Sequence, residues 1–588
     1  MFKYTLLLLS VLFLLAFPEF SPAAPDYVPD KPYPQKLQKT YTLKDGLAGD
    51  DVRAVLVDEE GNVWLDTDGG VSRFDGKIWK TFPAGTGPVA GRRKAIRESA
   101  ENYKKIEGIP CDDITVVAVG KGGEEWFGTS RGAIRRTSAG WEYYAGRRWL
   151  PDDYVNDIAV GEGGAAWIAT KKGVSKIYTR SMTLKEKAEY FEKLTRKRHV
   201  RYGLVSDCGL RKPGDLSTFY LRDSDNDGLW TGMYVAAEAF RFAVTGEEEA
   251  RRFARQSLLA LIRLEEITGI KGFVARSISK EKKKKGEWHL ASDGVWYWKG
   301  DTSSDEIVGH FFAYSVYYDL VANGEEKKQI AGVVSRIMDH IIDNKLALVD
   351  VDGKPTSWGR WAEEYFKPVD WFFEKGLQSL EILSHLKVAY HITGNPRYAR
   401  VYNELVKKGY ARNTIRQKIN IPGQVNHSDD ELAFLSYYPL LLYEKNAELR
   451  KIYLKSITRS WNIEKPERNP LWNFIYRASF GKRVDFDPEG AMQTLREIPL
   501  DLVTWTVRNS QRRDIKFRFY NDRFGRKQTW KVLPYYERPI MKWNENPYVV
   551  DGGNGGYSEE AGTFFLLPYW MGRYHGFIKE MKKEGGND

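Results

Sequence analysis

The sequence predicts a multidomain α+β protein, in which a repetitive β-sheet part is followed by a larger, all-helical part. Three observations support this division. The chain has 588 residues, enough for roughly two to four domains. Residues 41–180 repeat a pattern of alternating apolar positions and turn glycines, which is typical of short antiparallel strands. After Met182, apolar segments of helical length alternate with charged ones.

The composition is that of an ordinary globular protein. Hydrophobic residues make up 42% and charged residues 29%, which excludes disorder and coiled coil as descriptions of the chain. The net charge of +11 is modest for this length, so we expect no nucleic-acid binding. Aromatic residues reach 14%, a level that suits a sugar-binding cleft as well as core packing. The two cysteines, Cys111 and Cys208, exclude a disulfide framework, and whether they pair is left open.

The N-terminus has the layout of a secretory signal peptide. Lys3 precedes an apolar run over Thr5–Phe17, and Ser21–Ala23 offers a small-x-small cleavage site. The apolar run is too short for a transmembrane helix. We therefore expect a signal peptide over residues 1–23, a proline-rich linker over 24–40, and an exported protein, secreted or periplasmic, without a membrane span.

Residues 41–180 contain three copies of one motif, built around Trp64, Trp126 and Trp167. In each copy a threonine and then a glycine follow the tryptophan at three-residue intervals. The last two tryptophans lie about 40 positions apart, which is the period of a β-propeller blade. The motif resembles the two-component regulator propeller repeat of bacterial sensor ectodomains. We expect three propeller-like blades with the tryptophans in equivalent buried positions.

Three blades are fewer than a closed propeller requires. The open edges of the blades must therefore pack against the rest of the chain or against a second copy of it. A homodimer formed through these edges is one expectation.

The chain over residues 181–588 is built from helical hairpins. An apolar helix such as Leu229–Val244 is followed by an amphipathic charged helix such as Glu248–Thr268. Apolar helices belong inside and helices with a charged face outside, so we expect an (α/α)6-type toroid. The fifth inner helix is predicted at Ala491–Arg508, and the sixth at Ser558–Lys579.

The turn Thr393–Tyr398 is similar to the hairpin turns of six-hairpin glycosidases. This resemblance in architecture implies a glycan-active toroid domain with a role in carbohydrate metabolism.

Acidic residues gather where the inner helices begin. In a toroid the inner helices are parallel, so their N-termini open on one face. Capping needs one oxygen per helix, whereas these starts carry doubled acids. Glycoside hydrolysis needs two carboxyl groups across the scissile bond, one of them protonated. The candidate catalytic residues are Asp305 or Glu306 acting against Asp429 or Asp430, with Asp227 assisting.

Aromatic and polar side chains near these acids are the candidate substrate contacts, because flat rings suit stacking against a pyranose. The positive charge of this part of the chain favours an anionic glycan. The predicted contacts are Trp230, His310, Trp358, Arg360, Trp361, His427 and Glu431.

The loop before the first inner helix matches the start of a calcium loop. Asp223, Asp225 and Asp227 alternate and are followed by Gly228. An EF-hand needs a glutamate at the twelfth position, where Tyr234 stands, so a true EF-hand is not expected. A Ca²⁺ ion held by this loop with other ligands is the one cofactor that the sequence leaves open.

These features together predict an exported carbohydrate-active enzyme, a glycoside hydrolase that acts on an oligo- or polysaccharide. A polysaccharide lyase or an epimerase using the same cavity is one alternative. A non-catalytic, sensor-like scaffold that binds glycan or peptide is another. The doubled acids favour the enzyme.

Overall fold

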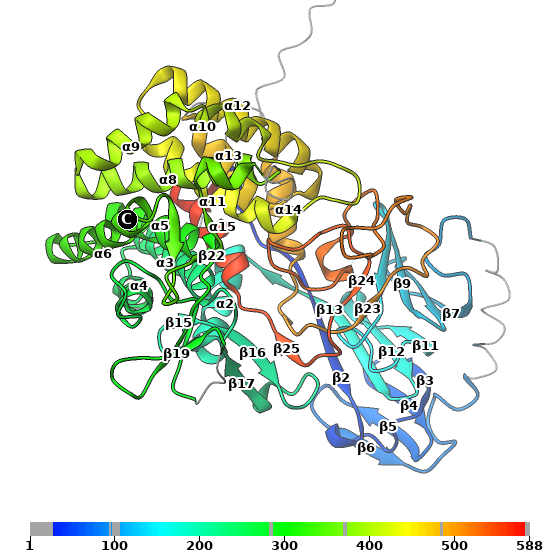
Figure 1. Ribbon diagram of the computed structural model, residues 1–588. Helices are drawn as coiled ribbons and strands as arrows, with labels where there is room; N and C mark the ends of the chain where they lie inside the picture. The colour runs from blue at the N-terminus through cyan, green and yellow to red at the C-terminus, as the bar shows by residue number, and fades with distance from the viewer. Residues whose placement is uncertain are drawn as a thin grey trace, which may run out of the picture.

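The computed structural model describes residues 27–92, 96, 106–281, 286–367, 373–481 and 486–581, and it combines helix and sheet as predicted (Figure 1). The predicted signal peptide lies outside the described residues. Within the described ranges there are thirteen α-helices, and none of these is long and apolar enough to cross a membrane.

Three four-stranded antiparallel sheets make up the N-terminal part. The first consists of β3 (Val52–Val57), β4 (Val63–Thr67), β5 (Gly70–Phe74) and β6 (Trp79–Phe82). The second consists of β7 (Ile114–Val119), β8 (Glu125–Thr129), β9 (Gly132–Thr137) and β10 (Gly140–Tyr144). The third consists of β11 (Val155–Val160), β12 (Ala166–Thr170), β13 (Gly173–Met182) and β2 (Tyr33–Tyr41).

The third sheet takes its fourth strand from the start of the chain. Strand β2 pairs with β13 from Tyr33 to Tyr41, so the second half of the expected linker is a sheet strand instead. Strand β11 contacts both β3 and β7, which places the third sheet against the other two. The prolines before Tyr33 are compatible with this arrangement because they favour extended chain.

The motif tryptophans occupy the second position of strands β4, β8 and β12. Trp126 and Trp167 are buried, at 1% and 4% exposure. Trp64 is only half-buried, and its indole N–H donates to Asp58 over 2.8 Å. The three positions are therefore equivalent in the strands but not in burial.

The threonine and glycine of the motif close the same hairpin in every copy. Each threonine hydroxyl donates a hydrogen bond of 2.8–2.9 Å to the carbonyl of the glycine three residues later. Each glycine has φ between +124° and +134°, and an added Cβ would come within 2.8 Å of a neighbouring strand's carbonyl oxygen. The pairs are Thr67–Gly70, Thr129–Gly132 and Thr170–Gly173.

Six inner helices contact one another in a closed ring, in the order α3, α5, α8, α11, α13, α15 and back to α3. They are α3 (Asp227–Thr245), α5 (Ser304–Leu320), α8 (Lys375–Thr393), α11 (His427–Tyr443), α13 (Pro470–Phe480) and α15 (Thr563–Tyr574). Each contacts the outer helix of its own hairpin, and α5, α8 and α13 also contact the outer helix of the preceding hairpin. In the same order the outer helices are α4 (Glu248–Glu266), α6 (Gly324–Asp343), α9 (Pro396–Lys407), α12 (Ala447–Glu464), α14 (Pro488–Glu497) and α2 (Leu184–Arg198). The short α10 (Tyr410–Asn413) follows α9.

The fifth hairpin differs from the prediction. Its inner helix is Pro470–Phe480, while Ala491 belongs to the outer helix α14. Pro499 stands just beyond the end of α14, and a proline cannot continue a helix. The sixth inner helix is also shorter than predicted, and it contacts α2.

Short strands join the helices of the ring. The pairs are β1 (Val28–Asp30) with β26 (Ile578–Glu580), β14 (Val200–Arg201) with β15 (Leu204–Val205), β21 (Ala347–Val349) with β22 (Pro355–Arg360), and β23 (Val507–Arg508) with β24 (Asp551–Gly552). The triples are β17 (Phe219–Arg222), β16 (Asp207–Leu210) and β25 (Ser558–Glu559), and β18 (Ile278–Ser279), β20 (Tyr297–Lys299) and β19 (Trp288–Leu290).

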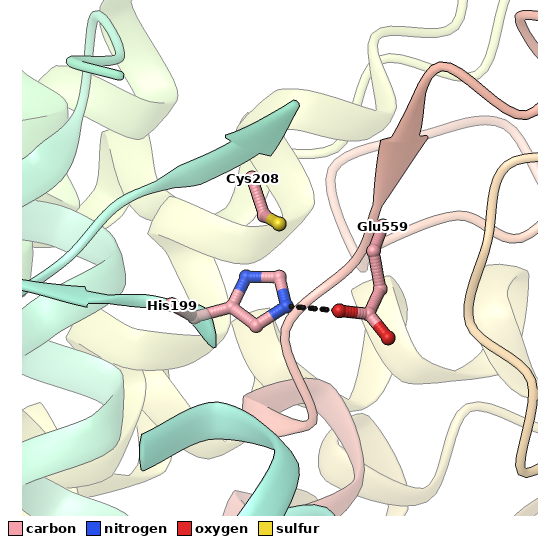
Figure 2. Close-up of side chains that lie close together, drawn as sticks. All are labelled: His199, Cys208 and Glu559. Atoms are coloured by element: carbon pink, nitrogen blue, oxygen red, sulfur yellow. Dashed lines mark hydrogen bonds and ion pairs between the residues drawn. The ribbon is translucent and has the colours of Figure 1, made fainter. Parts of the chain in front are cut away.

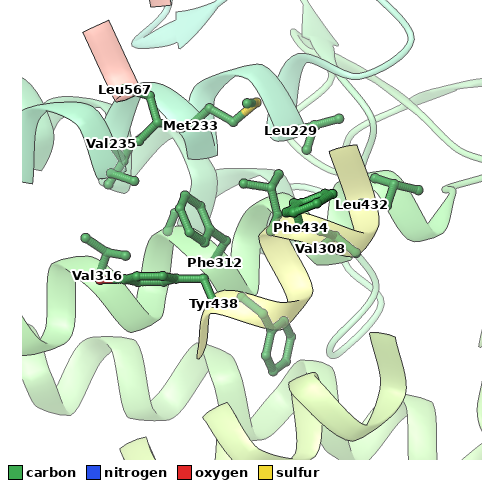
Figure 3. Close-up of a cluster of buried hydrophobic side chains, with 14 of the residues drawn as sticks. Leu229, Met233, Val235, Val308, Phe312, Val316, Leu432, Phe434, Tyr438 and Leu567 are labelled. Carbon is green, nitrogen blue, oxygen red and sulfur yellow. The ribbon is translucent and has the colours of Figure 1, made fainter. Parts of the chain in front are cut away.

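The main hydrophobic core lies between the inner helices. Figure 3 shows side chains of α3, α5, α11 and α15 meeting there, all of them buried. Helices α3 and α5 approach closely because Gly232 faces Gly309: a Cβ on Gly232 would lie 2.4 Å from the Gly309 carbonyl oxygen. This close contact fixes how the two helices are rotated, and with that which side chains face the centre of the ring.

The chain between α14 and α15 runs from the ring to the sheets and back. Beside the sheets, Glu537 accepts the backbone N–H of Tyr143 over 3.0 Å, and the Trp149 indole donates to the Tyr536 carbonyl over 3.0 Å. Lys542 follows shortly afterwards and lies at the ring. The sheets therefore anchor a segment that supplies side chains to the centre of the ring.

Candidate functional site

Five carboxyl groups gather where the inner helices begin; we call them the carboxyl cluster. Asp305 is in the first turn of α5, and Asp429 and Glu431 are near the start of α11. Glu374 immediately precedes α8, and Glu381 is inside it. The helix dipoles place partial positive charge at these N-terminal ends, which stabilises carboxylates there.

The members of the carboxyl cluster act on one another's ionisation. Burial raises the pKa of Glu381, Asp429 and Glu431, and the negative charge of Asp305 raises each of them further. The pKa of Glu374 is also raised, by burial. Carboxyl groups that repel each other in this way cannot all be ionised at neutral pH.

Glu431 is the clearest proton carrier of the carboxyl cluster. It is 1% exposed, and burial followed by the Asp305 charge raises its pKa to about 8, although Lys542 opposes the shift. Its Oε1 has no hydrogen-bond partner in the part of the chain that the structure describes. Asp305 and Asp429 are partly exposed, so the carboxyl cluster combines a protonated acid with groups that solvent reaches.

Two adjoining small pockets share Lys542, Trp543 and Phe564 in their walls. In the first, the Lys542 ammonium lies 4.2 Å from the centre of the Trp230 ring and so covers one face of it. The charge of Lys542 also acts on Glu431, which links the pockets to the carboxyl cluster.

The structure distinguishes the members of the two predicted acid pairs. Asp305 is partly exposed, whereas Glu306 is fully buried against Gly228, where an added Cβ would lie 1.9 Å from its Oε2. Asp429 is likewise partly exposed and Asp430 is buried. Asp305 and Asp429 therefore face the open side of the carboxyl cluster.

Asp227 and Asp430 are held by buried cations. Asp227 accepts hydrogen bonds from Arg201 over 2.9 Å and from Ser277. Asp430 lies 2.5 Å from the Lys418 ammonium. Burial raises the pKa of both acids, and the cations oppose that shift. We assign these two residues to the framework behind the carboxyl cluster.

The other predicted substrate contacts are spread over several environments. Trp361 is fully buried and donates its indole N–H to Glu381 over 2.9 Å, so it supports the carboxyl cluster from behind. Trp358 is 56% exposed on β22, and Arg360 donates to a backbone carbonyl of that strand. His310 is buried in α5, with Nδ1 2.6 Å from a carbonyl one turn earlier.

Two of the three aspartates of the predicted calcium loop have cationic partners. Asp225 is exposed and pairs with Lys299, and Asp227 pairs with Arg201. A Ca²⁺ ion held by these two carboxylates would have to displace both cations.

Two groups of three possible metal ligands, each with its ligand atoms within 4.8 Å, occur among the described residues. They are His199, Cys208 and Glu559, and His427, Glu464 and Glu467. In the first, Figure 2 shows Glu559 facing His199, 3.2 Å from its Nε2. Arg198 also donates to both oxygens of Glu559, over 2.6 and 2.8 Å, so this carboxylate is already neutralised. The thiols of Cys208 and Cys111 are both buried and free.

Sequence reasoning missed Glu374, Glu381 and Lys542. Glu381 did leave a signal, because a charged residue inside the apolar helix α8 is costly unless it serves a purpose. Lys542 left none, because it lies in a long segment whose path depends on contacts with the sheets.

Comparisons with known proteins assign no family. No family model and no curated protein matches the chain. A sugar epimerase from a ruminal bacterium aligns with 67% of this chain and 99% of its own, at 11% identity and a TM-score of 0.38. An unsaturated glucuronyl hydrolase specific for heparin aligns with 67% of this chain and 96% of its own, at 11% identity and a TM-score of 0.34.

A third solved structure is the extracellular domain of a putative hybrid two-component system from B. thetaiotaomicron. It aligns with 24% of this chain and 18% of its own, at 21% identity and a TM-score of 0.11. TM-scores of this size carry no argument about fold or function, so the site must be interpreted from its own chemistry.

Proposed function

We propose that the protein is a carbohydrate-active enzyme, a glycoside hydrolase that cleaves an oligo- or polysaccharide at the carboxyl cluster. The observation that carries this proposal is the pairing of Glu431 with Asp305. Glu431 has a pKa of about 8 and so holds a proton at neutral pH. The negative charge of Asp305 contributes to that shift, and burial raises the pKa of Asp305 as well.

This pairing supplies the two roles that glycoside hydrolysis requires. Glu431 donates its proton to the glycosidic oxygen as the bond to the leaving group breaks. Asp305 either attacks the anomeric carbon or removes a proton from the attacking water. Asp429 adds a third carboxyl group on the open side; because burial and then the charge of Glu374 raise its pKa, it is suited to donate a hydrogen bond to a sugar hydroxyl.

The charges near the carboxyl cluster suit a neutral sugar better than an anionic one. Lys542 lies 3.7 Å from Asp207 and 3.4 Å from Glu560, so its charge is already balanced. The acids of the carboxyl cluster add negative charge near it. We therefore favour a neutral glycan over the anionic one that the net charge suggested.

Export to the periplasm or the medium is part of the proposal and rests on the N-terminal sequence alone. Mass spectrometry of the protein from its native host should show a mature chain that begins near Ala24. A mature chain that retains Met1 would contradict export.

The proposal is tested by incubating the purified protein with neutral and anionic polysaccharides and measuring new reducing ends. Asp305→Asn and Glu431→Gln should each lower the rate by about 10²–10⁴-fold, because each removes one acid–base role while keeping shape. Matched controls are Asp352→Asn and Glu325→Gln, whose side chains are 56% and 84% exposed.

Both controls should retain full activity. Unchanged activity in both cluster variants would remove the catalytic role and leave a binding protein. Unsaturated products would indicate a lyase, and an altered sugar at unchanged chain length would indicate an epimerase.

A further inference from the structure

A second group of buried ionisable side chains surrounds Lys418, next to the carboxyl cluster. The Lys418 ammonium contacts Asp430 at 2.5 Å and also contacts Glu464. His427 Nδ1 lies 3.7 Å from Asp430 Oδ2 and 3.6 Å from Glu467 Oε1. All five side chains are 8% exposed or less.

This group has more negative than positive charge. Its three carboxyl groups surround one ammonium. Further positive charge comes from Arg518 and Arg526, which act on His427, and from Arg538, which acts on Glu467. Arg526 pairs with Asp522 over 2.7 Å. Among the described residues, Lys418 is the one lysine or arginine in direct contact with any of the three carboxyl groups.

Two oxygens of the group are also without hydrogen bonds. Glu464 Oε2 and Asp430 Oδ1 are buried and have no hydrogen-bond partner among the described residues. Burial of an ionised carboxylate without compensation costs several kcal/mol. The group therefore needs either bound protons or a bound cation.

The positions of the ligand atoms suit a metal ion. His427, Glu464 and Glu467 each offer one ligand atom within 4.8 Å of the others. In a tetrahedral zinc site with bonds of about 2.0–2.2 Å, ligand atoms lie roughly 3.4 Å apart. The measured 3.6 Å between His427 Nδ1 and Glu467 Oε1 is close to this spacing.

We propose that His427, Glu464 and Glu467 bind a divalent transition-metal ion, with Zn²⁺ the best match to one imidazole and two carboxylates. Lys418 remains the partner of Asp430 and of one Glu464 oxygen, Oε1, which leaves Glu464 Oε2 to bind the ion. Glu467 lines the second pocket beside the carboxyl cluster, which provides an access route and a fourth position for water.

The other group of possible ligands provides an internal comparison. Glu559 is neutralised by Arg198, and the pKa of the Cys208 thiol is raised to about 12 by burial and then by the charge of Glu559. Zinc binding there would require loss of the Arg198 ion pair and of the thiol proton. We therefore expect zinc at the His427 group and not at the Cys208 group.

The test is calorimetric titration of ZnCl₂ into the full-length mature protein after chelator treatment, with MgCl₂ as the comparison. We expect one equivalent of zinc per chain. Glu467→Gln should weaken zinc binding at least tenfold, because it removes a charged ligand and keeps the shape, whereas Cys208→Ser should bind like the wild type. His427→Gln is a second variant with the same expected loss.

A second readout identifies the ligands directly. X-ray absorption at the zinc edge of the loaded protein should show nitrogen and oxygen donors, including one imidazole, and no sulfur. A sulfur donor would place the ion at the Cys208 group and overturn the proposal. Circular dichroism checks that each variant is folded.

Three outcomes of the titrations would also overturn the proposal. The first is that the metal-free wild type binds no zinc at millimolar zinc. The second is that the wild type and the folded Glu467→Gln and His427→Gln variants bind zinc with equal affinity. The third is that only Cys208→Ser loses zinc binding. None of these outcomes bears on the hydrolase proposal, which is tested separately by Asp305 and Glu431.

Discussion

Replacing Glu431 by glutamine tests whether this carboxyl group is protonated at neutral pH. Burial, followed by the charge of Asp305, raises its pKa from 4.5 to about 8. A carboxyl whose pKa is higher in the folded state stabilises that state below its unfolded pKa, and this contribution is lost as the pH rises through the folded pKa. One pKa unit corresponds to about 1.4 kcal/mol. Between pH 5 and the folded pKa of about 8, the free energy of unfolding therefore falls by up to about 4 kcal/mol, and above that pKa it falls no further.

The glutamine variant has no such contribution to lose. Urea unfolding at pH 5, 7 and 9 gives the free energy of unfolding of both proteins. The difference, wild type minus Glu431→Gln, should fall by up to about 4 kcal/mol between pH 5 and pH 9. Glu325→Gln, at an 84% exposed side chain, should show no such trend. Parallel curves for wild type and Glu431→Gln would refute the raised pKa and, with it, the role of Glu431 as the acid.

Three further predictions concern packing and substrate contact. Lys418→Met should lower the free energy of unfolding by about 3–5 kcal/mol in urea, because it leaves buried carboxylates without their cation, and a loss below 1 kcal/mol would contradict this. Trp126→Ala should cost about 3–5 kcal/mol, and Trp64→Ala clearly less because Trp64 is half-buried; equal losses would mean that their burial does not differ. Trp230→Ala should raise KM more than it lowers kcat on the best glycan found, and an unchanged KM would exclude stacking on that ring.

The fold of the repetitive part could be predicted because each hairpin is specified by residues that lie close together in the sequence. Each copy carries its own hairpin, closed by a threonine hydroxyl and a positive-φ glycine such as Thr67 and Gly70. The fourth strand of the third sheet could not be predicted in the same way. Tyr33–Tyr41 pairs with a strand far away in the sequence, and its one proline, Pro34, indicated only extended chain.

Inner helices could be predicted where a long apolar segment was followed by a recognisable turn, as in α3, α5 and α11. Helix α13 has only eleven residues, and its apolar character was not distinguished from the surrounding chain. Acids at the helix starts were found, but adjacent residues such as Asp305 and Glu306 point in directions about 100° apart on a helix. Which of them faces the centre of the ring depends on helix rotation, set here by glycine contacts such as Gly232 with Gly309.

The most direct test of the central claim, that the carboxyl cluster hydrolyses a glycosidic bond, is cleavage of oligosaccharides in ¹⁸O-labelled water followed by mass spectrometry of the products. The proposed chemistry predicts one ¹⁸O atom for every bond cleaved, because water completes the reaction at the anomeric carbon. It also predicts that labelled product is lost in Asp305→Asn and Glu431→Gln. Cleavage products without label, or equal labelling by the wild type and both variants, would contradict the claim.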